Sequence, residues 1–324
     1  MDALSEVLNA VRLTGAVFFN GEFTAPWGFE AARVEKLAAL LPAGTERLLI
    51  YHFVIEGQAR LHTASGSASL TAGDLVVLPH GDTHTFYDGA PREYLNGTDT
   101  LLETFGTTDL NLIRYGGGGA PTRFICGYFG CERDAEQLFL GGLPPVITVH
   151  LRGDAAGRWL ERSICDLLRD GRPGQRALLS KMAEALFIEA LRRYMQSLPP
   201  DHTGWLAAAR DPVVGPALAL LHHDPRRRWS VAELASRAGA SRSVIGERFV
   251  HLLGTSPLAY LTRWRLHLSA RLLETTRRTV TQVADDVGYE SDAAFSRAFK
   301  REFGTSPARY RRRLEAAQAA QASN

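Results

Sequence analysis

The C-terminal third of the chain repeats itself, and this repeat constrains the fold more than any other feature of the sequence. The stretch from Leu234 to Tyr260 returns at Val283 to Tyr310, and the tetrapeptide GTSP occurs in both copies. Matching positions lie 49 residues apart before an internal turn and 50 apart after it, because the second turn, GYES, is one residue longer than the first, GAS. Two copies of one motif predict two copies of one supersecondary unit.

Each copy has the residues that a helix-turn-helix requires. Gly239 and Gly288 stand where the first helix must end in a left-handed residue. The apolar side chains of the second helix are four residues apart, which turns one face toward the core. The residues between them point outward, where a recognition helix meets the major groove. Serine or threonine is placed to cap each helix: Ser230, Ser241, Thr281 and Ser291.

The segment between the two copies, Pro257–Thr276, is predicted to be a single helix with proline in its first turn. A helix of this length spans about 30 Å. One turn of DNA is about 34 Å, so such a helix can place two recognition helices in successive major grooves on one side of the duplex. The repeat and its connecting helix therefore predict one subunit that contacts two adjacent grooves.

Charge is distributed unevenly along the chain. Residues 201–324 contain 19 Lys and Arg against 12 Asp and Glu, whereas residues 1–200 contain 18 against 23. A basic half suited to phosphates is joined to an acidic half that is not. The sequence has no run of eighteen apolar residues and begins without the basic-then-apolar layout of a signal peptide, so we expect a cytoplasmic protein with no membrane segment.

The second copy resembles the signature of the AraC/XylS-type regulators, and the resemblance extends over residues 213–314. It implies a DNA-binding transcription regulator, an activator or a repressor, rather than an enzyme. The partners it implies are promoter DNA, RNA polymerase, an unidentified small-molecule or redox effector and a second copy of the chain. The residues that carry it are Val283-Ala284, Val287-Gly288-Tyr289, Phe295, Arg297, Phe299-Lys300, Phe303-Gly304, Ser306-Pro307 and Tyr310-Arg311.

By this resemblance, four residues of each second helix face the groove. Glu247 stands where arginine is frequent, and its carboxylate could accept a hydrogen bond from cytosine N4 or pair with Arg248. The Arg226–Arg228 run is expected to be solvated or to face phosphate. The groove-facing residues are Arg242, Ser243, Gly246 and Glu247 in the first unit and Asp292, Ala293, Ser296 and Arg297 in the second. The phosphate-contacting candidates are Arg248, Arg263, Lys300, Arg301 and Arg311–Arg313.

Residues 10–130 are predicted to be β structure, with short apolar runs between Gly, Asp and Pro clusters. The stretch Gly73–His84 fits G-x5-P-x-G-x2-H and resembles the second motif of cupin β-barrels, whose histidine points inward. The upstream first motif lacks its two histidines, which argues against an ordinary cupin enzyme site. A cupin metalloenzyme with an accessory DNA-binding domain is the alternative to a cupin-like sensor.

Two cysteines, Cys126 and Cys131, could combine with His52 and His84 into a Cys2His2 set, which suits zinc. A separation of five places the two cysteines on opposite faces of a regular strand. Both reach one site only if a bulge or turn forms at a neighbouring glycine, Gly127 or Gly130. A redox pair and two inert buried thiols are the alternatives to a metal site.

The predicted fold class is α+β with two domains. The N-terminal domain is a cupin-like β-barrel followed by helices, and the C-terminal domain is all-α, with two helix-turn-helix units joined by a long helix. The helical stripe within 134–197 either packs on the barrel or forms a dimer helix. The expected boundaries are 1–133 for the barrel, 134–197 for the helices, 198–212 for a linker, 213–316 for the DNA-binding domain and 317–324 for a tail.

Overall fold

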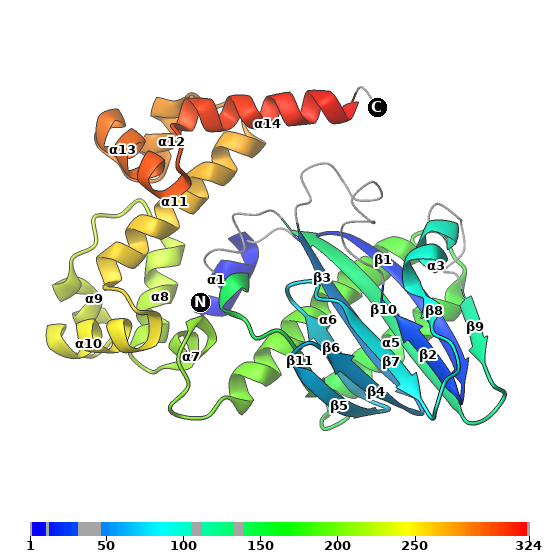
Figure 1. Cartoon of the computed structure of the whole chain (residues 1–324). Helices are drawn as coiled ribbons and strands as arrows, with labels where there is room; N and C mark the ends of the chain where they lie inside the picture. The colour runs from blue at the N-terminus through cyan, green and yellow to red at the C-terminus, as the bar shows by residue number, and fades with distance from the viewer. Residues whose placement is uncertain (1, 11–12, 32–46, 105–111, 132–138, 323–324) are drawn as a thin grey trace. The chain divides into compact units, whose positions relative to one another are not determined.

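The computed structural model describes residues 2–10, 13–31, 47–104, 112–131 and 139–322 (Figure 1). The chain divides into two compact units. Unit 1 comprises Met1–Arg12, Glu132–Leu143 and Leu198–Asn324, and unit 2 comprises Leu13–Cys131 and Pro144–Ser197. The first piece of unit 1 lies within the segment 1–133 that was expected to form the barrel.

Unit 2 consists of two β-sheets with a common core. One sheet has the order β11-β6-β3-β10-β1-β9 and the other β5-β4-β7-β2-β8. A short helix, α3 (Gly97–Thr104), follows β8. The strands are β1 (Leu13–Thr24), β2 (Trp27–Glu30), β3 (Arg47–Glu56), β4 (Gln58–Thr63), β5 (Gly66–Thr71), β6 (Asp74–Leu78), β7 (His84–Asp88), β8 (Leu95–Asn96), β9 (Leu112–Gly116), β10 (Pro121–Cys131) and β11 (Ile147–His150).

The side chains between the two sheets come from alternating positions of their strands. On β10, Phe124, Cys126 and Tyr128 enter this core together with residues of β2, β4 and β7 from the opposite sheet. Alternation is the pattern expected of a strand with one buried face, and it explains why the expected strand runs were found. Strand β11 was not expected, since 134–197 was predicted to be helical. It pairs with β6 and buries Ile147 and Val149 on one side.

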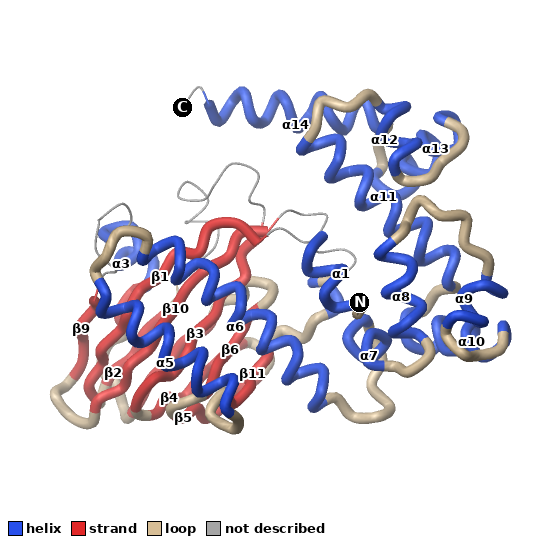
Figure 2. Tube along the Cα trace, turned by 180° about the vertical axis from the view of Figure 1, so that it is seen from behind, coloured by secondary structure: helices blue, strands red, loops and turns tan. Residues whose placement is uncertain are grey.

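Two helices, α5 (Ala155–Asp170) and α6 (Gln175–Ser197), lie across one face of the sheet structure (Figure 2). Helix α6 contacts β11, β1 and β6 of the six-stranded sheet. Its buried side chains, among them Leu179, Ala183 and Leu186, share one face. The apolar stripe therefore packs on the β structure, which was one of the two interpretations of its sequence.

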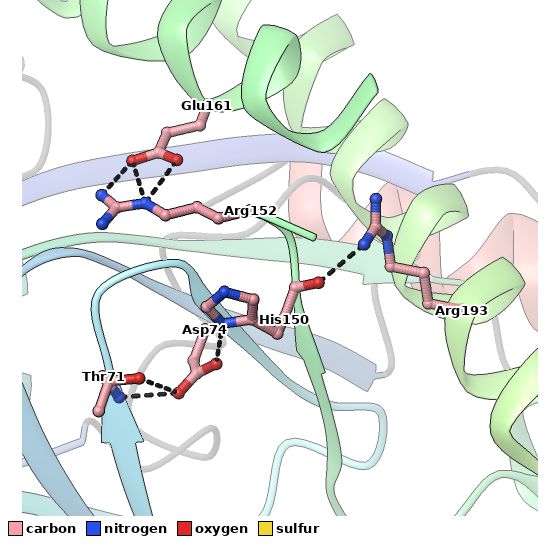
Figure 3. A network of polar contacts seen from close by, with 6 residues as sticks. All are labelled: Thr71, Asp74, His150, Arg152, Glu161 and Arg193. Atoms are coloured by element: carbon pink, nitrogen blue, oxygen red, sulfur yellow. Dashed lines mark hydrogen bonds and ion pairs between the residues drawn. The ribbon is translucent and has the colours of Figure 1, made fainter. Parts of the chain in front are cut away.

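Polar contacts fasten these helices to the sheet edge (Figure 3). Arg152 pairs with Glu161 of α5 and also donates to the Ile55 carbonyl at 2.8 Å. Arg193 of α6 donates to the His150 carbonyl at 2.7 Å, and the His150 ring contacts Asp74 Oδ1 at 2.8 Å. These polar contacts connect helix α6 to the edge strand β11, and β11 to the start of β6.

Unit 1 is helical. Its elements include α1 (Ala3–Ala10) and a 3-10 turn, η2 (Leu140–Gly142). The expected linker contains α7, in which Trp205, Leu206 and Ala208 are buried, so 198–212 is packed structure. The expected tail is helical as far as Ala322. The remaining helices are α7 (Trp205–Arg210), α8 (Val214–His223), α9 (Val231–Arg237), α10 (Arg242–Leu253), α11 (Pro257–Thr275), α12 (Val280–Asp286), α13 (Asp292–Phe303) and α14 (Pro307–Ala322).

The helix ends agree with the sequence except at α12. Ser230, Ser241 and Ser291 cap α9, α10 and α13 through their side chains. The cap of α12 is Thr279, which forms a reciprocal capping box with Gln282. The expected cap, Thr281, lies inside the first turn, where its backbone is already helical and its hydroxyl donates to Asp292.

The N-terminal helix α1 packs within unit 1 against α8 and α7. Its apolar face, Ala3, Leu4 and Val7, is buried. Glu6 lies 3.6 Å from His223 at the end of α8. Helix α1 thus contributes to the core of unit 1 through these three side chains. Among the described residues, no helix is long and apolar enough to cross a membrane.

Candidate nucleic-acid interface and a buried histidine–cysteine chain

The second helix of each repeat presents an exposed polar face. On α10, Ile245 and Phe249 are buried and face the core. On α13, Phe295 and Phe299 occupy the matching positions. The residues predicted to face a groove lie on the opposite side and are exposed or half-buried: Arg242, Ser243, Gly246, Glu247, Asp292, Ala293, Ser296 and Arg297. These eight residues therefore lie on the helix faces turned away from the core, where a recognition helix contacts a groove, and their contact with DNA stays a prediction.

The two surfaces differ in how their cations are used. Arg248 on α10 pairs with Asp211 at 2.6 Å. The other carboxylate oxygen of Asp211 accepts hydrogen bonds from the first amides of α8, at Val213 and Val214. The carboxylate that Arg248 meets is therefore Asp211 and not Glu247. This ion pair competes with a phosphate contact by Arg248.

The cations of α13 are not engaged in this way. Within the described part of the chain, Arg297 and Lys300 make no hydrogen bond or ion pair, and both are exposed. Arg242 at the start of α10 is likewise exposed and has no partner among the described residues. A guanidinium that is not already paired keeps its donors for a base edge or a phosphate.

The cores beneath the two helix-turn-helix units also differ. In the first, Trp205 Nε1 donates to the Tyr260 hydroxyl at 2.9 Å, and that hydroxyl lies 2.8 Å from His222 Nε2. The His222 ring stacks on Trp264 with centroids 4.2 Å apart. In the second, the hydrophobic core has Phe295 and Phe299 at its centre, and the buried ring of His267 packs against Phe303 beside it. Burial lowers the pKa of His222 to about 3.

Inside unit 2, three of the four predicted metal ligands form a buried chain of polar contacts. Cys126 Sγ lies 2.7 Å from His52 Nδ1, and His52 Nε2 lies 2.7 Å from His84 Nε2. His84 Nδ1 is 2.8 Å from the Asp82 carbonyl oxygen. The three side chains come from β10, β3 and β7, so the chain links both sheets.

The Asp82 carbonyl fixes the protons of this chain. A carbonyl only accepts, so His84 carries its hydrogen on Nδ1 and accepts at Nε2. His52 then donates from Nε2 and accepts at Nδ1, where Cys126 donates its S–H. Burial lowers the pKa of His52, lowers that of His84 to about 4 and raises that of the Cys126 thiol. All three groups are therefore neutral at pH 7, and each contact has one donor and one acceptor.

This arrangement does not fit a Cys2His2 zinc site. His52 turns one ring nitrogen to each neighbour, so an ion between the two Nε2 atoms cannot also reach Cys126. No group of three or more His, Cys, Asp or Glu side chains in the described residues could hold a metal ion. Strand β10 pairs with β3 in unbroken register from Phe124 to Cys131, so the bulge required to bring both cysteines together is not seen. The Cys131 side chain lies outside the described residues.

One polar group near this chain is absent from the residues singled out by sequence. The Tyr128 hydroxyl is buried and has no hydrogen-bond partner in the described structure. Burial, with a further contribution from Cys126, raises the pKa of Tyr128. Alternation along β10 from Cys126 would have placed Tyr128 on the same face.

In the comparison with known proteins, two family models match two separate parts of the chain. The Cupin family matches residues 2–196, and the Helix-turn-helix domain family matches residues 234–313. A putative AraC-like transcription regulator of Streptomyces antibioticus is 39% identical over 202 residues, which are 62% of this chain and 67% of that protein.

A second relative extends over the whole molecule. The RCS-specific HTH-type transcriptional activator RclR of Escherichia coli (strain K12) is 26% identical, over 97% of this chain and 98% of its own length. Among solved structures, the DNA-binding domain of AdpA in complex with a target DNA is 36% identical, covers 33% of this chain and 95% of that chain, and superposes with a TM-score of 0.31.

The two recognition helices, the helix that joins them and the preceding two-sheet domain agree with the two family matches and with the Streptomyces relative. The chain belongs to the AraC-like transcription regulators with an N-terminal cupin domain.

Proposed function

We propose that this regulator recognises a specific promoter sequence through both recognition helices of one subunit and that a chemical signal received by the cupin domain controls this binding. The observation that carries the first part is the pair of capped recognition helices, each with an exposed polar face, joined by the single helix α11. Nineteen residues of helix extend about 28 Å, comparable to one turn of DNA.

The DNA part is tested by selecting binding sites from a random DNA pool with the full-length protein, followed by footprinting of the selected site. We expect two protected patches about one helical turn apart. Affinity should fall steeply with salt, since phosphate contacts release counterions. Failure to enrich any sequence, or a single protected patch with a flat salt response, contradicts the proposal.

The signal is proposed to act on the chain formed by Cys126, His52 and His84. Three buried polar side chains within an otherwise apolar core cost stability unless each is satisfied, and here each depends on the next. A ligand or oxidant that changes any member alters both sheets, because the chain links them. A metal ion, which the geometry around His52 disfavours, is one arm of the test.

The matched variants are Cys126→Ser and Cys165→Ser. Cys165 is the half-buried thiol of α5, outside the core between the sheets. DNA affinity is measured with and without a hydroperoxide, Zn²⁺ or a panel of small organic molecules. The Cys126 variant should lose a response that the Cys165 variant keeps. A response that survives Cys126→Ser and His52→Gln contradicts this site.

Self-association and activation complete the proposal. Helices α5 and α6 expose large apolar side chains, Trp159, Leu178 and Ile188, which support a dimer formed through this face. Trp159→Glu should then lower the mass seen by sedimentation. Activation, the activity named for the E. coli relative, requires a contact with RNA polymerase. Transcription in a purified system should rise when the protein is added to a template that carries the selected site.

A further inference from the structure

The two helix-turn-helix units are connected by more than helix α11. The loop between α8 and α9, Asp224–Trp229, which we call the inter-unit loop, belongs by sequence to the first helix-turn-helix unit but contacts the second. Both helix-turn-helix units lie within unit 1. Arg265, in the middle of α11, donates from Nε to the Pro225 carbonyl at 2.6 Å and from Nη2 to the Arg227 carbonyl at 2.9 Å. Its Nη1 also reaches the Gly288 carbonyl at 3.4 Å. One guanidinium thus holds backbone of both units.

The backbone of the second unit approaches this loop closely at Gly288. A Cβ built on Gly288 would lie 2.6 Å from the Arg226 carbonyl oxygen and 2.9 Å from its Cα. Gly239, the matching turn residue of the first unit, has a similar left-handed conformation, with φ +66° against +83°, but nothing lies within 4 Å of its Cβ position. Both matching glycines thus form the turn, but only Gly288 also forms a close contact with the inter-unit loop.

Ion pairs continue the contact on either side. Arg226 meets Asp285 of α12 at 2.9 Å, and Arg228 meets Glu290 in the turn before α13. The run Arg226–Arg228 was expected to be solvated or to face phosphate. Arg226 and Arg228 are exposed, and each also meets a carboxylate of the second helix-turn-helix unit, whereas Arg227 pairs with Glu233 of the first. Within the loop, Trp229 Nε1 donates to the Asp224 carbonyl at 2.9 Å, so the loop has its own fixed shape.

We propose that Arg265 and Gly288 are positioning residues that fix the spacing and rotation of the two recognition helices relative to each other. A single helix joining two small units permits twisting and bending at its ends. A second contact, made away from that helix, removes this freedom. Neither residue lies on the exposed faces of α10 and α13, so their effect on DNA passes through the placement of those helices.

This inference rests on the proposed recognition of DNA by both units and adds a property that binding alone does not require. One inserted base pair moves the second groove by roughly 3.4 Å along the duplex and rotates it by about 34°. A module with fixed spacing cannot follow that change and loses base contacts of one unit. A module free to twist follows it at little cost.

The test uses the full-length protein and the selected site, with one base pair added or removed between its two protected patches. Wild-type affinity should fall at least about tenfold on the altered sites, the loss expected for mispositioned base contacts. Gly288→Ala and Arg265→Lys should bind the three sites within about threefold of one another. Gly239→Ala is the matched control, because it places the same strained residue in open space, and it should keep the wild-type profile.

The lysine variant keeps the positive charge and the backbone conformation but lacks the fork that reaches two carbonyls at once. It therefore tests the contact without the strain of alanine at a positive φ. Wild-type spacing profiles for both Gly288→Ala and Arg265→Lys would overturn the inference, provided that melting curves show both to be folded. If the wild type enriches no DNA sequence, the proposed DNA recognition fails, and if it enriches one but the profiles do not differ, only this inference fails.

Discussion

The two helix-turn-helix units share a sequence pattern and a backbone, yet they differ in what lies beneath and upon their recognition helices. The first has a polar, titratable core of Trp205, His222 and Tyr260 and is covered by α1. Its Arg248 is paired with a carboxylate. The second has an aromatic core and exposes Arg297 and Lys300.

The two copies share the turn glycines and the serine caps of α10 and α13, whereas their cores and the pairing of their cations differ. The first helix-turn-helix unit packs against α1 and α7 within unit 1. In the second, Arg278 pairs with Asp286, but Arg297 and Lys300 on the recognition helix make no ion pair among the described residues. We therefore expect the first unit to dominate the pH response of folding and the second to dominate sequence discrimination on DNA.

The largest expected effect is on acid stability. The folded pKa of His222, about 3, lies below its unfolded value of about 6.5. Below pH 6.5 the unfolded state therefore binds more protons, so the stability that depends on neutral His222 is present above pH 6.5 and is lost as the pH falls toward 3. The loss should reach about 4 kcal/mol, measured by urea unfolding with tryptophan fluorescence.

His222→Leu is the control for this prediction, because it removes the titrating group and leaves His52 and His84 in place. The slope of unfolding free energy against pH between 6.5 and 4 should be shallower in the variant. An unchanged slope would show that His222 does not control acid unfolding. The difference between the two cores would then have no effect on how the unfolding free energy depends on pH.

The next effect concerns base recognition. Arg297→Ala should weaken binding to the selected site by about 1–3 kcal/mol and relax the preference at one base pair, with a smaller change on random DNA. Glu247→Ala, the change at the matching position of the first helix-turn-helix unit, should cost less, because a carboxylate gains nothing from the phosphate backbone. Competition titrations with single-base variants of the site measure both. Equal losses on specific and random DNA would assign Arg297 to a phosphate.

A smaller effect is expected for Lys300, whose ammonium is a point charge suited to phosphate. Lys300→Ala should lower the slope of log affinity against log salt concentration by about 1 and weaken all sequences alike. The same titration of Arg301→Ala gives a neighbouring cation for comparison. If Lys300→Ala instead weakens binding to some DNA sequences more than to others, Lys300 contacts a base edge. The two helix-turn-helix units would then differ even more in how many base contacts they make.

The smallest effect is expected for Arg248, because its pairing with Asp211 is half exposed. Arg248→Ala should lower the unfolding free energy by no more than about 1 kcal/mol, in the range of surface ion pairs. Its effect on DNA affinity should be weaker than that of Lys300→Ala, since the guanidinium is already engaged. If instead Arg248→Ala lowers the slope of log affinity against log salt concentration by about 1, then Arg248 leaves Asp211 and contacts a phosphate when DNA binds. The first helix-turn-helix unit would then contribute one more cation to DNA binding than this structure indicates.

Local signals in the sequence predicted the fold where the relevant contacts are also local. The caps at Ser241 and Ser291 form hydrogen bonds within a few residues, and so do the turn glycines. The repeated sequence pattern was therefore enough to predict them. Thr281 and Thr279 both precede the same apolar run, and only the reciprocal bond with Gln282 identifies Thr279 as the cap. Strand β11 was missed because a four-residue strand between helical segments is recognised only through its partner β6.

The candidate sites followed the same rule. His52, His84 and Cys126 were named from motif and spacing, and the structure brings all three into contact across β3, β7 and β10. What they bind stays a prediction. The pairing of Arg248 with Asp211 and the contacts of Arg265 join residues about forty positions apart, and no periodicity in a single sequence carries that information.

Helix α1 has a further consequence for the architecture of the molecule. Helix α1 belongs to the same compact unit as residues 198–324, although the cupin match begins at residue 2. The first helix of the cupin-matched segment therefore packs against α8 and α7 and not against the two sheets. A fragment that begins at Leu198 lacks this helix, and a sensor borrowed from a relative replaces it as well unless residues 3–10 are kept.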